Sequence, residues 1–159
     1  METVAIYSER PIKTYGLKVE HGLVLVTGQG RLADLVALQS SLAGVDPPPR
    51  VIHTSAWPED DTWSISLCLA HDQLPALLAV LERAGLELSR EPVPVGLIHL
   101  QGPHFGDRYG IVSQALEGLR QVAVAPLGLG AVVHSLFMLF EPAQCPTALE
   151  ALAEYFSSP

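Results

Sequence analysis

The chain is poor in the residues that bind nucleic acids. It contains only nine Lys and Arg against 17 Asp and Glu in 159 residues, which gives a formal net charge of −8. An acidic chain with scattered basic residues lacks the electrostatic footprint needed to hold phosphate groups or an anionic lipid surface. We therefore expect neither a nucleic acid nor a membrane as a partner.

Cysteine is also scarce, and the residues of metal and nucleophilic sites are not clustered. Cys68 and Cys145 stand far apart, without a CxxC pair or a Cys/His ligand spacing, which predicts free, buried thiols and a cytoplasmic protein. The sequence contains no HExxH motif and no Gly-x-Ser-x-Gly elbow. We expect no metal, no cofactor and no nucleophilic catalysis. The histidines are scattered: His21, His53, His71, His99, His104 and His134.

Targeting signals are missing as well. The N-terminus has neither a basic region nor a long apolar run, so no signal peptide is predicted. Residues 122–140 carry no charge and are long enough to span a membrane, but Pro126, Gly128 and Gly130 interrupt the segment. We interpret it as two buried strands around a turn, Gln121–Ala125 and Ala131–Phe140.

The most informative positive feature is an internal repeat. Residues 22–28 are GLVLVTG, and residues 96–102 are GLIHLQG. In each copy this run leads into a helical pattern, an extended pair and a second helical pattern. A repeat of about half the chain predicts two small domains of one fold rather than a solenoid. We place them at residues 1–90 and 95–159, joined by a proline-containing linker.

Apolar periodicity predicts the elements of the first copy. A strand over Leu23–Thr27 extends back to Leu17–Val19 through a turn at Glu20-His21, and Asp72 caps the second helix. The strand over Thr62–Leu69 alternates, with its apolar residues on one face, and is expected to be half buried. The other predicted elements are a helix over Arg31–Leu42, a strand over Arg50–Ala56, a helix ending at Gly85, and a closing strand over Leu86–Ser89.

The second copy has only five predicted elements. They are a strand over Val95–Gln101, a helix over Gly110–Leu119, the two strands given above, and a helix over Thr147–Phe156. A βαββαβ unit needs six elements. We therefore hypothesise that an N-terminal strand over residues 3–8 completes the second sheet, or that the domains exchange edge strands.

Tandem βαββαβ copies in which Gly closes the first strand resemble ACT domains, in particular the regulatory pair of aspartate kinases. Residues 102–112, GPHFGDRYGIV, resemble the family's Gly-x-x-Met-x-x-x-x-Gly-Val-Ala, and residues 52–55, IHTS, resemble its Ile-x-Thr-Ser. The resemblance implies an α+β fold of two ferredoxin-like domains, each an antiparallel sheet with helices on one face. The first copy departs from the family's Asp-x-Pro-Gly, since it has Gly28-Gln-Gly-Arg31.

Two glycine-containing segments are candidate ligand sites. Residues 27–32 (Thr27, Gly28, Gln29, Gly30, Arg31, Leu32) are expected between a strand and a helix N-terminus, where backbone N–H groups attract a carboxylate. The alternative is a plain tight turn. His53, Thr54 and Ser55 are expected at a strand end beside this segment, with ordinary sheet-face alternation as their alternative.

The second candidate is the loop from Gly102 to Gly110. The resemblance implies that its backbone contacts the α-carboxylate and α-amine of an amino acid, and Asp107 and Arg108 could pair with ligand charges. The alternative is a surface loop. The loop's other candidate residues are His104, Phe105, Gly106 and Tyr109.

These features predict a non-catalytic, amino-acid-binding regulatory protein with sites at ACT domain interfaces. A content of 48% hydrophobic residues against 16% charged ones favours a homodimer, and the regulated enzyme would act as a partner in trans. Two alternatives stay open. One is a small enzyme that uses the 102–110 loop, and the other is an interaction module in which Trp57 and Trp63 form the contact, although packing of these two side chains within a hairpin is also expected.

Overall fold

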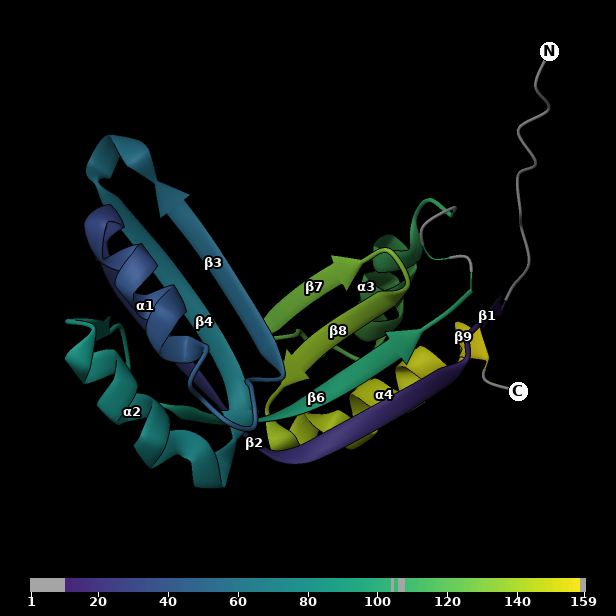
Figure 1. The fold of residues 1–159 in the computed structure, drawn as a ribbon. Helices are drawn as coiled ribbons and strands as arrows, with labels where there is room; N and C mark the ends of the chain where they lie inside the picture. Colours follow the sequence, from purple (N-terminus) through teal and green to yellow (C-terminus); the bar gives the residue numbers. More distant parts are fainter. Residues whose placement is uncertain (1–10, 104, 106–107, 158–159) are drawn as a thin grey trace, which may run out of the picture. The chain divides into compact units, whose positions relative to one another are not determined.

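The computed structural model describes residues 11–103, 105 and 108–157. The chain divides into two compact units. We call Gly22–Val95 the inserted unit, and we call the described residues up to His21 together with those from Gly96 onward the terminal unit. The long strand β2 (Gly16–Arg31) begins in the terminal unit and ends in the inserted unit (Figure 1).

The inserted unit consists of strand, helix, two strands, helix and strand. Its sheet has the order β3–β4–β2, with β5 on the other side of β2, and every pairing is antiparallel. Helices α1 and α2 lie together on one face (Figure 1). After β2, its elements are α1 (Leu35–Leu42), β3 (Val51–Trp57), β4 (Thr62–Ala70), α2 (Leu74–Arg83) and β5 (Glu87–Leu88).

Alternation along β4 builds the core of this unit, as predicted from the sequence. Trp63, Ile65, Leu67 and Leu69 are each at most 2% exposed. Successive side chains of a strand point to opposite faces, so Thr62, Ser64 and Ser66 lie on the other face. The four apolar side chains of β4 pack against residues of β2 and of both helices: Val24, Val26, Leu38, Leu77 and Leu81.

The terminal unit has the same order of elements from β6 onward. In its sheet β2 is followed by β6, β8 and β7, and β9 pairs in parallel with β1 (Ile12–Lys13). The elements are β6 (Val93–Gln101), α3 (Ile111–Gln121), β7 (Gly128–Val132), β8 (Ser135–Phe140), α4 (Cys145–Ala153) and β9 (Phe156–Ser157).

The first part of β2 belongs to the core of the terminal unit. Leu17 and Val19 pack against a cluster that includes the buried Ile98 and Phe140, and the Tyr15 N–H donates to the Gln101 carbonyl at 2.6 Å. This part of β2 occupies the place beside β6 that β5 occupies beside β2 in the inserted unit. The hypothesised strand over residues 3–8 lies outside the described residues.

Three predicted boundaries in the inserted unit are wrong. No turn interrupts β2 at Glu20-His21. The first helix starts at Leu35, after a 3-10 turn over Leu32–Asp34, because Arg31 is still paired with Thr62 of β4. Asp72 lies in a 3-10 turn, and the residue that precedes α2 is Gln73.

The terminal unit also differs from prediction at three places. Residues 121–125 are no strand, because the N–H groups of Val122 and Val124 both donate to the Leu119 carbonyl and extend the end of α3. Residues 131–140 form a hairpin that turns at 133–134, because Gly128 and Gly130 pair with Leu139 and Phe137. The last helix ends at Ala153, and Phe156 belongs to β9, which is the sixth element missing from the prediction.

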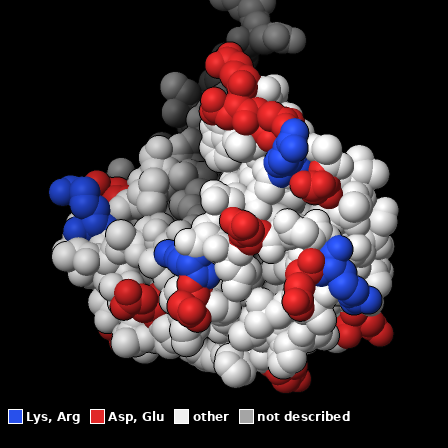
Figure 2. All heavy atoms as spheres, turned by 90° about the vertical axis from the view of Figure 1, so that its left-hand side faces the viewer, with Lys and Arg blue, Asp and Glu red and all other residues white. Residues whose placement is uncertain are grey.

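Charged side chains of both signs are interspersed on the surface. On the face in Figure 2, the Lys and Arg side chains stand apart from one another and lie next to Asp or Glu. This distribution offers no continuous basic surface on that face.

Within the described part of the chain, no helix is long and apolar enough to cross a membrane.

Candidate functional site

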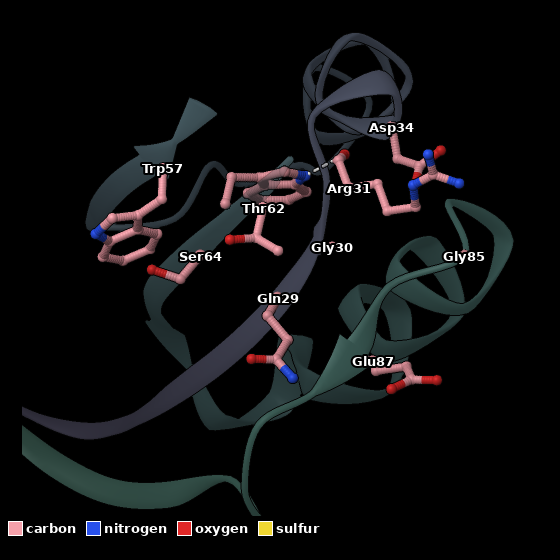
Figure 3. A pocket seen from close by; sticks show the side chains of 10 residues that line it. Gln29, Gly30, Arg31, Asp34, Trp57, Thr62, Ser64, Gly85 and Glu87 are labelled. Atoms are coloured by element: carbon pink, nitrogen blue, oxygen red, sulfur yellow. Dashed lines mark hydrogen bonds between the residues drawn. The ribbon is translucent and has the colours of Figure 1, made fainter. Parts of the chain in front are cut away.

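A surface hollow of about 470 Å³ lies in the inserted unit (Figure 3). It is bounded by the end of β2, the turn before α1, the β3–β4 hairpin and the segment between α2 and β5. Its lining residues are Gln29, Gly30, Arg31, Asp34, Trp57, Thr62, Trp63, Ser64, Gly85 and Glu87.

Three contacts join the end of β2 to the tip of the β3–β4 hairpin. The Trp63 indole N–H donates to the Arg31 carbonyl at 2.6 Å. The Arg31 guanidinium donates to one carboxylate oxygen of Asp61 at 2.9 and 3.1 Å, and the Leu32 N–H donates to the Asp61 carbonyl at 3.3 Å. Asp61 has a left-handed backbone with φ of 53°. The wall of the hollow is therefore fixed by both backbone and side-chain bonds.

Gly30 serves packing in this wall. A methyl group at Gly30 would lie 3.2 Å from the Trp63 indole nitrogen and 3.3 Å from a Leu86 methyl, and both side chains are buried. Gly28–Arg31 forms strand paired with Ile65–Thr62. The expected place of Gly28–Arg31 between a strand and a helix N-terminus is therefore wrong, and so is the alternative of a plain tight turn, because β4 supplies backbone partners as far as Arg31.

The hollow offers charges of both signs and an aromatic surface. Arg31 from the end of β2, Asp34 from the turn before α1 and Glu87 from β5 all line it (Figure 3). The Arg31–Asp61 pair is mostly exposed, with side chains 77% and 51% accessible, so solvent screens it. Arginine has five N–H donors, and Asp61 accepts two bonds from them. A guanidinium near carboxylates suits a zwitterion, since each ligand charge meets its opposite.

Polar side chains of the sheet and one indole complete the lining. Gln29 is the register partner of Ser64, and Arg31 that of Thr62, so these four side chains share the face of the sheet opposite the helices. Trp57, which is 50% exposed, stands at the edge (Figure 3). The sequence suggested Thr62 and Ser64 only as the polar half of an alternating strand. Glu87 carried no signal, because the β5–β2 pairing alone brings it here.

Several predicted residues lie outside this lining. Thr27 and Gly28 precede it in β2, and Leu32 lies in the 3-10 turn between the lining residues Arg31 and Asp34. The Thr27 hydroxyl is buried without a hydrogen-bond partner among the described residues. His53, Thr54 and Ser55 lie inside β3, opposite Ser66, Ile65 and Ser64, and not at a strand end.

The two tryptophans are not register partners. Trp57 lies opposite Thr62, and Trp63 lies opposite Ala56, so the two indoles point to opposite faces of the sheet. Trp63 is core, with 1% of its surface exposed, whereas Trp57 is half exposed. Only Trp57 is therefore available to a ligand or partner.

A second hollow, of about 240 Å³, lies at the corresponding place in the terminal unit. It is formed by the start of α3, the residues before it and the β7–β8 hairpin. Four predicted residues line it: Phe105, Arg108, Tyr109 and Gly110. His104, Gly106 and Asp107 lie outside the described residues.

This second hollow is more apolar than the first. Ile111, Val112, Val132 and Leu136 contribute to its lining. Gly102 does not line it, and is buried under the Phe105 ring, with which any side chain at this position would collide. Gly102 is therefore a packing residue. The first hollow, with its carboxylates and guanidinium, is the stronger candidate for a polar metabolite.

Metal chemistry finds no support in the described residues, among which no group of three or more His, Cys, Asp or Glu could hold an ion.

No protein-family model matches the chain, and no curated protein matches it in sequence. Solved structures do match its fold. The regulatory subunit of aspartate kinase from Thermus thermophilus has a TM-score of 0.77 at 11% identity, over 91% of this chain and 99% of that one.

The chain has the fold of an aspartate kinase regulatory region. Clostridium acetobutylicum aspartate kinase matches 95% of this chain with 37% of its own length, at a TM-score of 0.72 and 13% identity. E. coli aspartokinase III in complex with lysine and aspartate matches 92% of this chain with 34% of its own, at a TM-score of 0.58 and 18% identity. The predicted resemblance to the regulatory ACT pair of these kinases is confirmed, as a likeness of fold.

Proposed function

We propose that the chain is a non-catalytic regulatory protein that binds a free amino acid in the hollow of the inserted unit. The inserted and terminal units would be two ferredoxin-like ACT domains, with the first part of β2 completing the second sheet. The observation that carries the proposal is the placing of a guanidinium, two carboxylates and amide and hydroxyl groups around one hollow of about 470 Å³.

Each part of a free amino acid has a counterpart in this lining. Arg31 suits the α-carboxylate, because charge-assisted bonds to a guanidinium are strong and directional. Asp34 and Glu87 suit the α-ammonium group. Gln29, Thr62 and Ser64 can bond a polar side chain, and Trp57 offers an apolar or cation-binding surface.

Regulation would follow from a difference in affinity between two states of the protein. We propose that the chain is a homodimer and acts on a partner enzyme in trans. Action in trans is supported by the match to a whole regulatory subunit, that of Thermus thermophilus aspartate kinase. An amino acid as ligand is supported by the E. coli kinase, which was solved in complex with lysine and aspartate and of which this chain matches about a third.

A thermal-shift screen against the twenty amino acids at millimolar concentration tests the proposal. Ligand at about 100 times its dissociation constant adds about 2.7 kcal/mol to the free energy of unfolding. We therefore expect a selective rise in melting temperature with one or two amino acids. Arg31→Ala should abolish the rise. Arg120→Ala is the matched control, since Arg120 forms a similarly exposed pair with Glu117 at 2.7 Å, in the terminal unit.

Two results would overturn the proposal. A flat response to all twenty amino acids would remove the ligand class. A shift that persists in Arg31→Ala would move the binding site away from the hollow of the inserted unit.

A further inference from the structure

The guanidinium that the hollow offers to a ligand already has a carboxylate partner. Among the described residues that line the hollow, Arg31 alone carries a positive charge. Its Nε and Nη2 atoms donate to Asp61 at 3.1 and 2.9 Å. Asp61 follows the 3-10 turn of residues 58–60 at the tip of the β3–β4 hairpin. The carboxylate of a ligand and that of Asp61 therefore suit the same two donors.

The contact between Asp61 and Arg31 leaves room for a better one. Both Arg31 donors share a single oxygen of Asp61, Oδ2. A carboxylate gains strength and direction when each of its two oxygens accepts from a different guanidinium nitrogen. A free amino acid can approach in that orientation, because 77% of the Arg31 side chain is accessible. A ligand carboxylate can thus replace Asp61 with improved geometry.

The exposure of the pair makes the exchange inexpensive. Exposed ion pairs are weak because solvent screens them, and the Asp61 side chain is already 51% accessible. Water can therefore solvate its carboxylate once the bonds to Arg31 are broken. Glu59 and Asp60 precede Asp61 on the same tip, so a ligand carboxylate at Arg31 also meets repulsion from this acidic tip.

The backbone of the hairpin tip is held independently of the Asp61 carboxylate. The Asp61 carbonyl accepts a hydrogen bond from the Leu32 N–H at 3.3 Å, and the Asp61 N–H donates to the Pro58 carbonyl at 3.3 Å. The Trp63 indole N–H donates to the Arg31 carbonyl. These bonds do not involve the carboxylate. Its release from Arg31 therefore changes a side-chain contact of the tip and leaves the strand register as it is.

We propose that Asp61 competes with the carboxylate of the ligand for Arg31, so that binding exchanges one carboxylate for the other and releases Asp61 from the end of β2. The inference rests on the proposed function, because it concerns the same hollow and an amino acid as ligand. Asp61 then lowers the affinity of the site for carboxylates. Its release gives the free and bound proteins different contacts at the hairpin tip, and a regulatory ligand requires such a difference.

Calorimetric titration of Asp61→Asn tests the competition, with the amino acid that gives the largest shift in the thermal screen. Asparagine has nearly the same shape and tolerates the left-handed backbone of this position. Its neutral amide binds a guanidinium more weakly than a carboxylate does. Because an exposed pair contributes little, the dissociation constant should fall by about two- to fivefold. If Asp61 instead positioned Arg31 for the ligand, Asp61→Asn would bind more weakly.

Asp60→Asn is the matched control. It removes the same charge from the same tip, whereas the bonds to Arg31 come from Asp61. Its dissociation constant should stay close to that of the wild type. Circular dichroism should show both variants folded. If Asp61→Asn does not fold, Asp61→Gly replaces it, because glycine adopts the left-handed backbone without strain.

Nuclear magnetic resonance of the Arg31 Nε–H group, assigned with Arg31→Lys, tests the exchange directly. Without ligand, this signal should differ between the wild type and Asp61→Asn, because only the wild type has a carboxylate on Arg31. With saturating amino acid the two signals should coincide, because the ligand carboxylate occupies Arg31 in both proteins.

The outcomes separate this inference from the proposed function. A flat thermal screen for the wild type and Asp61→Asn alike would overturn the proposed function, and the competition with it. Binding by the wild type, with Asp61→Asn no tighter than Asp60→Asn, would overturn the competition alone. Arg31 signals that still differ at saturation would do the same, since Asp61 would then remain on Arg31 in the complex.

Discussion

Replacing Gly30 by alanine tests whether this glycine serves packing or ligand approach. The added methyl would lie 3.2 and 3.3 Å from two atoms of the Trp63 indole and 3.3 Å from a Leu86 methyl. The indole cannot easily move away, because it is 1% exposed and its N–H is bonded to the Arg31 carbonyl. The methyl must therefore strain the core.

Two opposing effects set the magnitude. Overpacking a dense core costs about 1–3 kcal/mol, whereas Gly→Ala reduces the entropy of the unfolded chain and contributes about 0.4–1 kcal/mol of stability. The free energy of unfolding of Gly30→Ala should fall by about 1–2 kcal/mol. For a unit the size of the inserted unit, Gly22–Val95, this loss lowers the melting temperature by about 4–16 °C.

Gly16→Ala is the matched control in the same strand. Its methyl would lie no closer than 3.9 Å to any other side chain, so only the entropic gain remains, and its stability should equal or slightly exceed that of the wild type. Urea unfolding followed by circular dichroism measures both variants. Equal stability of Gly30→Ala and Gly16→Ala, with loss of amino-acid binding only in the former, would refute the packing argument and favour a role in ligand approach.

Three further predictions concern the same structure. Trp63→Ala should lower the free energy of unfolding by about 3–5 kcal/mol, because it leaves a large cavity and frees the Arg31 carbonyl, and urea unfolding measures the loss. Asp61→Ala should change stability by less than about 1 kcal/mol in the same assay, since its pair with Arg31 is exposed. Burial raises the pKa of the Cys145 thiol above its ordinary value of 9.0, so it should react with a thiol reagent at pH 8 more slowly in native protein than in unfolded protein. The raised pKa also contributes to the free energy of unfolding. This contribution is complete below the ordinary pKa and is lost as pH rises through the pKa of the folded state. Identical alkaline unfolding of the wild type and Cys145→Ala would contradict this.

Short-range pattern was enough to predict much of the secondary structure. The alternation of Thr62–Leu69 predicted a half-buried strand, and its apolar positions are the core of the inserted unit. The helix that ends before Gly85 was likewise predictable, because its apolar stripe recurs with the helical period and Gly85 adopts φ of +70°.

The errors lie where distant segments decide the conformation. Gly28–Arg31 has the composition of a turn, yet β4 holds it as strand. The glycines of β7 suggested a turn, yet they pair with β8, and the Phe137 ring lies where a side chain of Gly130 would be. In both cases long-range pairing outweighs local preference, because it satisfies backbone groups and fills space beside large aromatic rings.

The sequence by itself determined the repeat and the order of most helices and strands, because these depend on periodicity along the chain. Its motifs at residues 52–55 and 102–112 carried the resemblance to the regulatory ACT pair. Tertiary structure decided which face each polar residue occupies and which residues meet. The predicted segment around Gly28 did reach a hollow, but its companions Ser64 and Glu87 come from two other segments, β4 and β5. Only the antiparallel pairing of β2 with β4 and β5 brings them together, and the spacing of residues along the chain does not encode that pairing.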